Sequence, residues 1–273
     1  MNLEILFLLF LAHFVADFPL QFQRIIELKN NHNQRRRLVG NAIHSCIHFL
    51  VSSIFVLNYM SPSILLIIGC ISLFHGILDF YKSEFIFKYP KRKNNVSFFL
   101  LDQLMHLLII FFTLFVINMN PSTWPFFQGI KSRMINFFYS SILNITYNGK
   151  LILSFTLLVI GLWGIGIFIR VVLGSISLKS SGVEPDIKVV SKDNINGGAM
   201  DGGFIIGILE RIFIISSILL NIPLVIGFIL TVKSVARLKK FENDKFVEVF
   251  IIGSFISFVS SIVIGYMVKA LIV

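Results

Sequence analysis

The segment Ser97–Met119, which reads SFFLLDQLMHLLIIFFTLFVINM, indicates the fold class of this chain. As an α-helix it is long enough to cross the hydrocarbon core of a bilayer, which is about 30 Å thick. Its ionisable side chains are Asp102 and His106, four residues apart and therefore on one helix face. The segment predicts a membrane-spanning helix with one polar patch.

The composition of the whole chain agrees with this prediction. Of 273 residues, 56% are hydrophobic and 14% are charged, whereas roughly a quarter are charged in soluble domains. This composition excludes an ordinary soluble protein and a disordered chain, and it favours an all-α, polytopic transmembrane helix bundle. The formal net charge of +10 does not indicate nucleic acid, because the basic residues lie in short clusters between apolar runs. We therefore expect a lipid bilayer as partner and no nucleic acid.

Eight apolar segments are candidate spans. A seven-span alternative exists, because only Asn221-Ile222-Pro223 divides the sixth segment from the seventh, and one long span from Ile212 to Val232 would absorb both. The eight segments are Leu3–Leu20, Leu38–Tyr59, Ser63–Phe80, Ser97–Met119, Leu151–Val172, Gly203–Leu220, Ile222–Ala236 and Val247–Ile272.

The placement of basic residues predicts the orientation. Most of the 24 Lys and Arg residues fall in alternate loops, and the positive-inside rule places those loops in the cytoplasm. Both termini are then outside. Merging the sixth and seventh segments would move the basic residues between Lys233 and Lys245 outside, so we favour eight spans.

The chain divides into four predicted regions. Residues 1–120 form a four-span core with His and Asp residues, and residues 121–177 form an aromatic segment along the outer interface followed by the fifth span. Residues 178–202 are polar and glycine-rich and predict a cytoplasmic linker, and residues 203–273 hold three spans.

Each of the first four spans carries a pair of polar residues at i, i+4 spacing. Counted from the cytoplasmic ends, the pairs stack into a deeper layer of four imidazoles and a shallower layer of three carboxylates and one imidazole. The first and third spans carry the same His-x-x-x-Asp-Phe pattern, which predicts a parallel duplication of one helical hairpin. The pairs are His13 with Asp17, His44 with His48, His75 with Asp79, and Asp102 with His106.

This residue set predicts a metal site. Ionisable groups inside a span cost about 2.5–3.5 kcal/mol each on insertion scales, and a divalent cation offers several of them one common partner. Mixed His and Asp ligation suits a transition metal such as Zn, Fe or Mn, with one or two ions bound. The alternative is a metal-free His–Asp network for proton relay or structure. Gln21, Asn41 and Gln103 are candidates for hydrogen bonds to the metal ligands. Lys82 either binds an anionic group or extends its ammonium group to the membrane surface.

These motifs resemble the bacterial membrane family known as domain of unknown function 3307. The resemblance covers roughly residues 8–112 and implies a multi-pass protein of the bacterial cytoplasmic (inner) membrane, without naming a reaction. It rests on His13-x-x-x-Asp17-Phe18-x-x-Gln21, His44, His75-x-x-x-Asp79-x-x-Lys82 and Asp102-Gln103-x-x-His106.

Longer members of that family are similar in the C-terminal half as well. The shared residues are Glu210, Arg211, Lys233, Arg237 and Glu248. We expect them to form ion pairs that lock helices; the alternative is an anion-binding or coupling site facing the cytoplasm. Gly203 and Gly207, four residues apart, would allow close helix packing.

Four functions remain compatible with the sequence. The first is a metal-dependent hydrolase of a lipid-linked or membrane-embedded substrate, with Asp79 or Asp102 as candidate general base; a His-x-x-x-Asp pair on a membrane helix is also similar to predicted membrane-bound hydrolases. The second is a transition-metal or proton-coupled transporter, which the few polar residues in the outer halves of the spans disfavour. The third is a bis-histidine haem protein, and the fourth is a non-catalytic structural or partner-binding membrane protein. The oligomeric state stays open.

Overall fold

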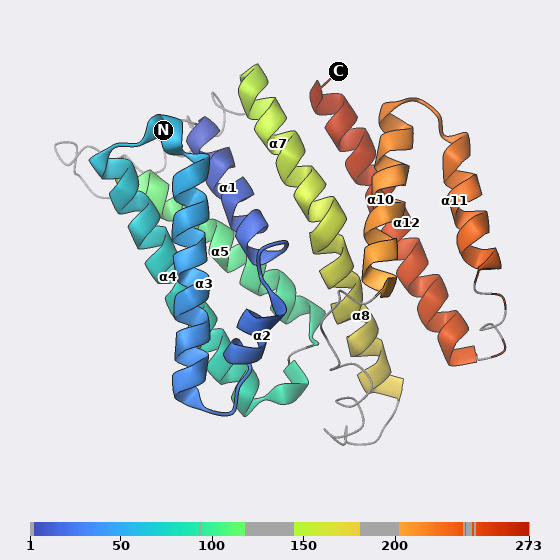
Figure 1. Cartoon of the computed structure of the whole chain (residues 1–273), viewed down its shortest axis with the longest axis horizontal. Helices are drawn as coiled ribbons and strands as arrows, with labels where there is room; N and C mark the ends of the chain where they lie inside the picture. The colour runs from blue at the N-terminus through green and yellow to red at the C-terminus, as the bar shows by residue number, and fades with distance from the viewer. Residues whose placement is uncertain are drawn as a thin grey trace, which may run out of the picture. The chain divides into compact units, whose positions relative to one another are not determined.

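The computed structural model describes residues 3–92, 94–117, 145–180, 202–236 and 244–272, together with 238 and 242. Every long regular element in these ranges is a helix, and no strand occurs among them. The predicted all-α class is confirmed (Figure 1). The interfacial aromatic segment, nearly all of the predicted linker and Arg237 lie outside the described residues.

The chain forms two compact units. Unit 1 comprises Met1–Pro90 with Leu101–Thr156, and unit 2 comprises Lys91–Leu100 with Leu157–Val273. Unit 1 contains α1 (Leu3–Asp17), α2 (Gln23–Lys29), α3 (Gln34–Phe55), α4 (Pro62–Lys88) and most of α5 (Val96–Ile117), with the start of α7 (Tyr147–Val159). Helix α3 is central in unit 1, because it contacts α1, α2 and α4.

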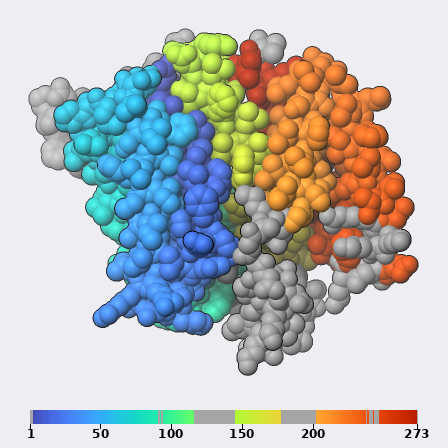
Figure 2. All heavy atoms as spheres, viewed as in Figure 1, coloured from blue at the N-terminus to red at the C-terminus, as the bar shows by residue number. Residues whose placement is uncertain are grey.

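Unit 2 is built around α10. It contains the π-helical turn η4 (Ile160–Gly164), α8 (Ile165–Ser180), α10 (Gly202–Leu219), α11 (Leu224–Val235) and α12 (Asp244–Ile272). Helix α10 contacts α8, α11 and α12. Figure 2 shows α10 and α11 side by side in orange. Apolar side chains such as Leu224 and Phe228 stay largely exposed on α11, as expected for a surface that faces lipid.

Six helical stretches are long and apolar enough to cross a membrane, which supports the predicted membrane character. Helix α1, with 15 residues, and α11, with 12, are shorter than each of these six stretches. The six stretches are Gln34–Phe55, Pro62–Lys88, Val96–Phe115, Tyr147–Ile176, Gly202–Leu219 and Phe246–Ile272.

The sixth and seventh segments are separate helices. Helix α10 ends where Asn221 adopts a φ of 58°, a left-handed conformation that asparagine tolerates better than most residues. The backbone N–H of Ile222 bonds back to the carbonyl of Ser217 at 2.8 Å, and Pro223 follows. The chain therefore turns here, and one long helix from Ile212 to Val232 does not form.

Several helix limits differ from the predicted segments. Helix α1 stops at Asp17 rather than Leu20, because Pro19 has no N–H and disfavours helical backbone at the residue before it. Helix α3 begins four residues earlier than predicted, where the side chain of Asn33 accepts a hydrogen bond from the N–H of Arg35. Helix α4 continues to Lys88, two turns beyond the predicted end.

Helix α2 lies between the first two predicted spans, where the basic residues predict a loop. It packs against α3 at Gly40, where an added Cβ would lie only 2.8 Å from the Cβ of Leu28 and from the backbone nitrogen of Lys29. A side chain at position 40 would push α2 away. Gly40 therefore sets the distance between α2 and α3.

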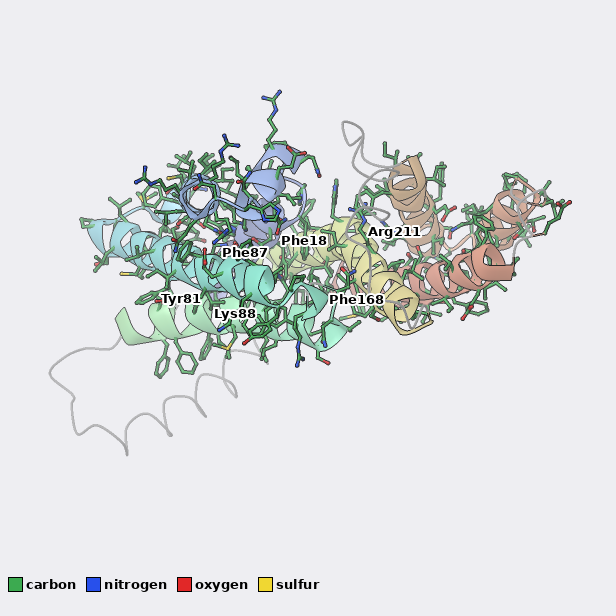
Figure 3. All side chains as sticks on the ribbon, turned by 90° about the horizontal axis from the view of Figure 1, so that it is seen from below. Phe18, Tyr81, Phe87, Lys88, Phe168 and Arg211 are labelled. Carbon is green, nitrogen blue, oxygen red and sulfur yellow. The ribbon has the colours of Figure 1, made fainter. Side chains whose placement is uncertain are left out.

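A buried arginine anchors the connection between α2 and α3 to α4. The guanidinium of Arg37 donates to both carboxylate oxygens of Glu84, at 2.8 and 2.9 Å, and to the carbonyls of Asn31 and His32. It also lies over the ring of Phe87, which is labelled in Figure 3. Arg37 thus stabilises the fold, in addition to being one of the basic residues that predict the orientation in the membrane.

The close approach at Gly40 leads to a stability prediction. Gly40→Ala should lower the unfolding free energy by roughly 1–3 kcal/mol, because the methyl group overlaps α2 and the helix must shift. Unfolding of the detergent-solubilised protein in increasing dodecyl sulfate would measure the change.

Gly69→Ala on α4 is the matched control. A Cβ at position 69 has nothing within 4 Å, so this substitution should be neutral, or stabilising by up to about 1 kcal/mol through helix propensity. Equal destabilisation by both substitutions would contradict the role given to Gly40.

Candidate metal centre

The structure brings the eight polar residues of the first four spans together inside unit 1. They come from α1, α3, α4 and α5, two from each helix, because i, i+4 spacing points both side chains of a pair to the same side. All eight are buried, and none is more than 8% exposed. The members of this His/Asp cluster are His13, Asp17, His44, His48, His75, Asp79, Asp102 and His106.

Asp17 is the acceptor for helix α3. Its Oδ1 lies 3.0 Å from Nε2 of His44 and 2.9 Å from Nε2 of His48. His13 and His75 approach the same carboxylate, each with Nε2 at 3.7 Å from one of its oxygens. Four imidazoles from three helices therefore surround one carboxylate at the C-terminal end of α1.

Asp79 and Asp102 receive the remaining imidazole contacts. Nε2 of His75 lies 3.6 Å from Asp79, and Nε2 of His44 lies 3.7 Å from it. Nε2 of His106 lies 3.5 Å from Asp79 and 3.6 Å from Asp102. Asp79 thus connects α3, α4 and α5, while Asp102 connects only to α4 and its own helix.

The four imidazoles of the deeper layer lie against one another. The ring centroids of His48 and His75 are 3.7 Å apart, and those of His75 and His106 are 4.2 Å apart. His13 is between 5.3 and 5.5 Å from the other three. Four imidazoles, one from each of α1, α3, α4 and α5, therefore form one contiguous layer.

The donor set fits a transition metal. Within the described chain, Nε2 of His13, His75 and His106 is buried without a hydrogen-bond partner, and an unpaired buried nitrogen is costly. Three groups of the cluster have ligand atoms within 4.8 Å of one another and could hold an ion. These groups are His13, Asp17, His48 and His75; His44, His75 and Asp79; and Asp79, Asp102 and His106.

Of the four residues predicted to support the cluster, two contact its carboxylates. The Nζ of Lys82 donates to Asp102 at 2.6 Å and lies 3.9 Å from Asp79. The amide of Gln103 donates to Asp17 and to Asp102, each at 3.3 Å. Lys82 therefore compensates carboxylate charge, and Gln103 stabilises two carboxylates by hydrogen bonds.

The other two supporting residues lie apart from the ligands. Asn41 is buried, but it donates to the carbonyl of Arg37 and the hydroxyl of Ser83 rather than to a cluster member. Gln21 follows the end of α1 and makes no hydrogen bond to the cluster among the described residues. Asn41 therefore joins α3 to α4 near the cluster.

Lys29 is a site residue that the sequence pattern did not predict. The positive-inside pattern explains Lys29 as one of the basic residues that orient the chain, yet it is buried at the end of α2 and its Nζ donates directly to Oδ2 of Asp79. The apolar spacing of Ile25, Ile26 and Leu28 was a signal for helix α2. Nothing in the sequence distinguished Lys29 from the solvated basic residues around it.

The C-terminal polar residues lie in unit 2 and form a separate arrangement. Glu210 and Lys233 form an ion pair at 2.6 Å. Arg211, labelled in Figure 3, is buried and donates to the carbonyl of Leu162 and the hydroxyl of Ser257 rather than to a carboxylate. Glu248 is exposed on α12, and Arg237 lies outside the described residues, so the five-residue ionic cluster stays a prediction.

Fold and site together define a class: an all-α membrane protein with a buried His/Asp cluster that could hold a metal ion. Residues 5–132 match the family model described as protein of unknown function (DUF3307), which confirms the resemblance noted above over this part of the chain. Neither the curated proteins nor the solved structures gave a significant match. The similarity of the C-terminal half to longer members stays a prediction.

The contact of Lys29 with Asp79 leads to a second stability prediction. Lys29→Met should destabilise the metal-free protein by about 3–5 kcal/mol, because it leaves a buried carboxylate without its cation. Arg24→Met, on the exposed side of the same helix, should have little effect. The double variant Lys29→Met/Asp79→Asn should recover part of the loss, and purely additive effects in this cycle would contradict the pairing.

Proposed function

We propose that the His/Asp cluster of unit 1 binds one or two divalent transition-metal ions and that the protein is a metal-dependent hydrolase of a lipid-linked or membrane-embedded substrate. The observation that carries the proposal is the convergence of five imidazoles and three carboxylates in one buried site, with three Nε2 atoms unpaired. Imidazole and carboxylate ligands suit Zn, Fe or Mn. A bound ion supplies Lewis acidity and a water of lowered pKa.

The placement of the cluster favours a one-sided site over a transport path. An apolar core from α1, α4 and α5 continues from the cluster toward the N-terminal ends of α1 and α4. No polar chain crosses this core among the described residues, whereas a transporter needs ligands on both sides of its central site. The core consists of Leu6, Leu9, Val56, Ile64, Ile67, Ile68, Ile71, Ile110 and Leu114.

The surroundings of the carboxylates suggest how a reaction would be divided among them. Asp17 accepts from two imidazoles and is suited to hold the ligands in place. Asp102 lies beside Lys82, whose side chain is 30% exposed. Asp102 is therefore the better candidate for general base, with Asp79 second, and Lys82 is placed to orient an anionic part of the substrate.

We also propose the orientation given by the basic residues. Lys82 and Lys29 lie toward the basic loops, so the accessible end of the cluster would face the cytoplasm and both termini the outside. The membrane would be the bacterial cytoplasmic membrane, as the family resemblance implies.

Elemental analysis of the purified full-length protein tests the metal site. The wild type should contain about one or two equivalents of a transition metal, and His75→Ala and Asp79→Asn should lose most of it, because each belongs to two of the candidate ligand groups. His32→Ala is the matched control, since His32 is exposed and outside the cluster. A wild type without stoichiometric metal would contradict the proposal, and a haem Soret band would replace it with the haem alternative.

Chelation followed by metal replacement tests whether the ion is part of the folded state. Removing the metal should lower the Tm, and restoring it should raise the Tm, since a ligand at 100 times its Kd stabilises by about 2.7 kcal/mol. His75→Ala should show no such response. Metal-dependent Tm shifts without uptake into proteoliposomes would favour the hydrolase, whereas metal-dependent uptake would establish the transporter alternative.

A further inference from the structure

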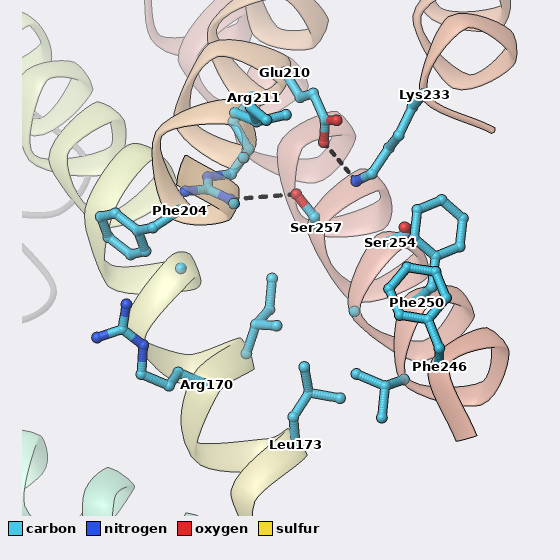
Figure 4. A pocket seen from close by; sticks show the side chains of 17 residues that line it. Arg170, Leu173, Phe204, Glu210, Arg211, Lys233, Phe246, Phe250, Ser254 and Ser257 are labelled. Atoms are coloured by element: carbon cyan, nitrogen blue, oxygen red, sulfur yellow. Dashed lines mark hydrogen bonds and ion pairs between the residues drawn. The ribbon is translucent and has the colours of Figure 1, made fainter. Parts of the chain in front are cut away.

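Unit 2 contains a cavity of about 330 Å³ that the proposed metal chemistry does not use. Its walls come from α8, α10, α11 and α12 (Figure 4). Most of the lining is apolar, and two lining residues, Ile206 and Val249, remain 46% and 42% exposed. In a membrane-spanning unit the cavity therefore opens beside surface that faces lipid.

The cavity wall holds the buried guanidinium of Arg211. Arg211 is 2% exposed and forms no ion pair among the described residues. Its Nε and Nη2 donate to the carbonyl of Leu162, at 3.2 and 2.6 Å, and its Nη1 lies 3.4 Å from the hydroxyl of Ser257. A guanidinium has five N–H donors, so two remain for a ligand.

The backbone around Arg211 is arranged to hold this side chain. Leu162 belongs to the π-helical turn η4, a rare geometry that recurs at functional sites. A Cβ at Gly166 would lie 2.9 Å from Nη2 of Arg211, and one at Gly207 would lie 3.0 Å from Nη1. Two glycines on two helices thus leave room for the guanidinium beside the cavity.

The charge balance of the lining favours an anion. Among the described lining residues, the one acid, Glu210, is paired with Lys233 at 2.6 Å, and this ion pair leaves the charge of Arg211 without a carboxylate of its own. Figure 4 shows this ion pair and the Arg211–Ser257 contact on the same wall. A positive charge inside a membrane span is costly without a partner, so a bound anion would stabilise unit 2.

We infer that this cavity binds the phosphate headgroup of an anionic membrane lipid through Arg211, with the acyl chains along the apolar wall. Guanidinium binds phosphate through paired N–H donors. Lipid is favoured over free phosphate because apolar side chains such as Leu173 and Phe246 line most of the cavity, and a small hydrated ion gains nothing from them. The inference rests on unit 2 alone and is independent of the metal site.

Thermal unfolding of the full-length protein in detergent tests this inference. Added phosphatidylglycerol should raise the Tm by roughly 2–4 °C more than added phosphatidylcholine. Arg211→Gln should abolish the difference, whereas Arg36→Gln, a change of an exposed arginine in unit 1, should preserve it. Inorganic phosphate is the third probe: if it reproduces the whole rise, the site takes free phosphate and the lipid assignment is overturned.

A second pair of variants keeps the test decisive if Arg211→Gln does not fold. Ser254 lines the cavity without bonding to Arg211, so Ser254→Leu fills the space and leaves the guanidinium contacts intact. Ser254→Leu should lose the response to phosphatidylglycerol, and Ser254→Ala should retain it. Equal responses to the two lipids in the wild type, or a preference that survives Ser254→Leu, would overturn the inference.

Discussion

The contact of the Asp17 carboxylate with His44 and His48 is the interaction on which unit 1 depends. An isolated carboxylate inside an apolar bundle would be strongly destabilising. Here α1 ends at this residue, and α3 supplies two imidazoles at hydrogen-bonding distance. The other cluster residues follow the same principle, because each lies close to a member from a different helix. The polar contacts of the His/Asp cluster therefore specify how the four helices pack against one another. Apolar surfaces alone would not, because they are equally well accommodated by lipid.

Basic residues serve two purposes in this chain, and their burial distinguishes them. Arg24 and Arg36 are exposed and fit a purely topological role. Lys29 and Arg37 are buried, and each bonds to a carboxylate on α4. The short helix α2 carries one of them and is held by Gly40, so a stretch that resembles a solvated loop becomes the cover of the His/Asp cluster.

The two units solve the problem of buried charge in different ways. In unit 1, imidazoles, carboxylates and lysine ammonium groups compensate one another, and three unpaired nitrogens leave a place for a cation. Within the part of unit 2 that the structure describes, Arg211 has a backbone carbonyl and a hydroxyl as its hydrogen-bond partners. A site rich in acceptors favours a metal ion, whereas a buried guanidinium with spare donors favours an anion.

The sequence by itself determined the all-α membrane class, eight apolar helices and the eight cluster residues, because apolar length and i, i+4 spacing are local properties of a helix. It also located the break at Asn221, where the backbone turns. Only the tertiary structure decided that Lys29 reaches Asp79, that Arg211 bonds to a π-helical carbonyl, and that Glu248 is exposed. These contacts join residues distant in the chain, and their partners depend on how helices pack, which no local pattern encodes.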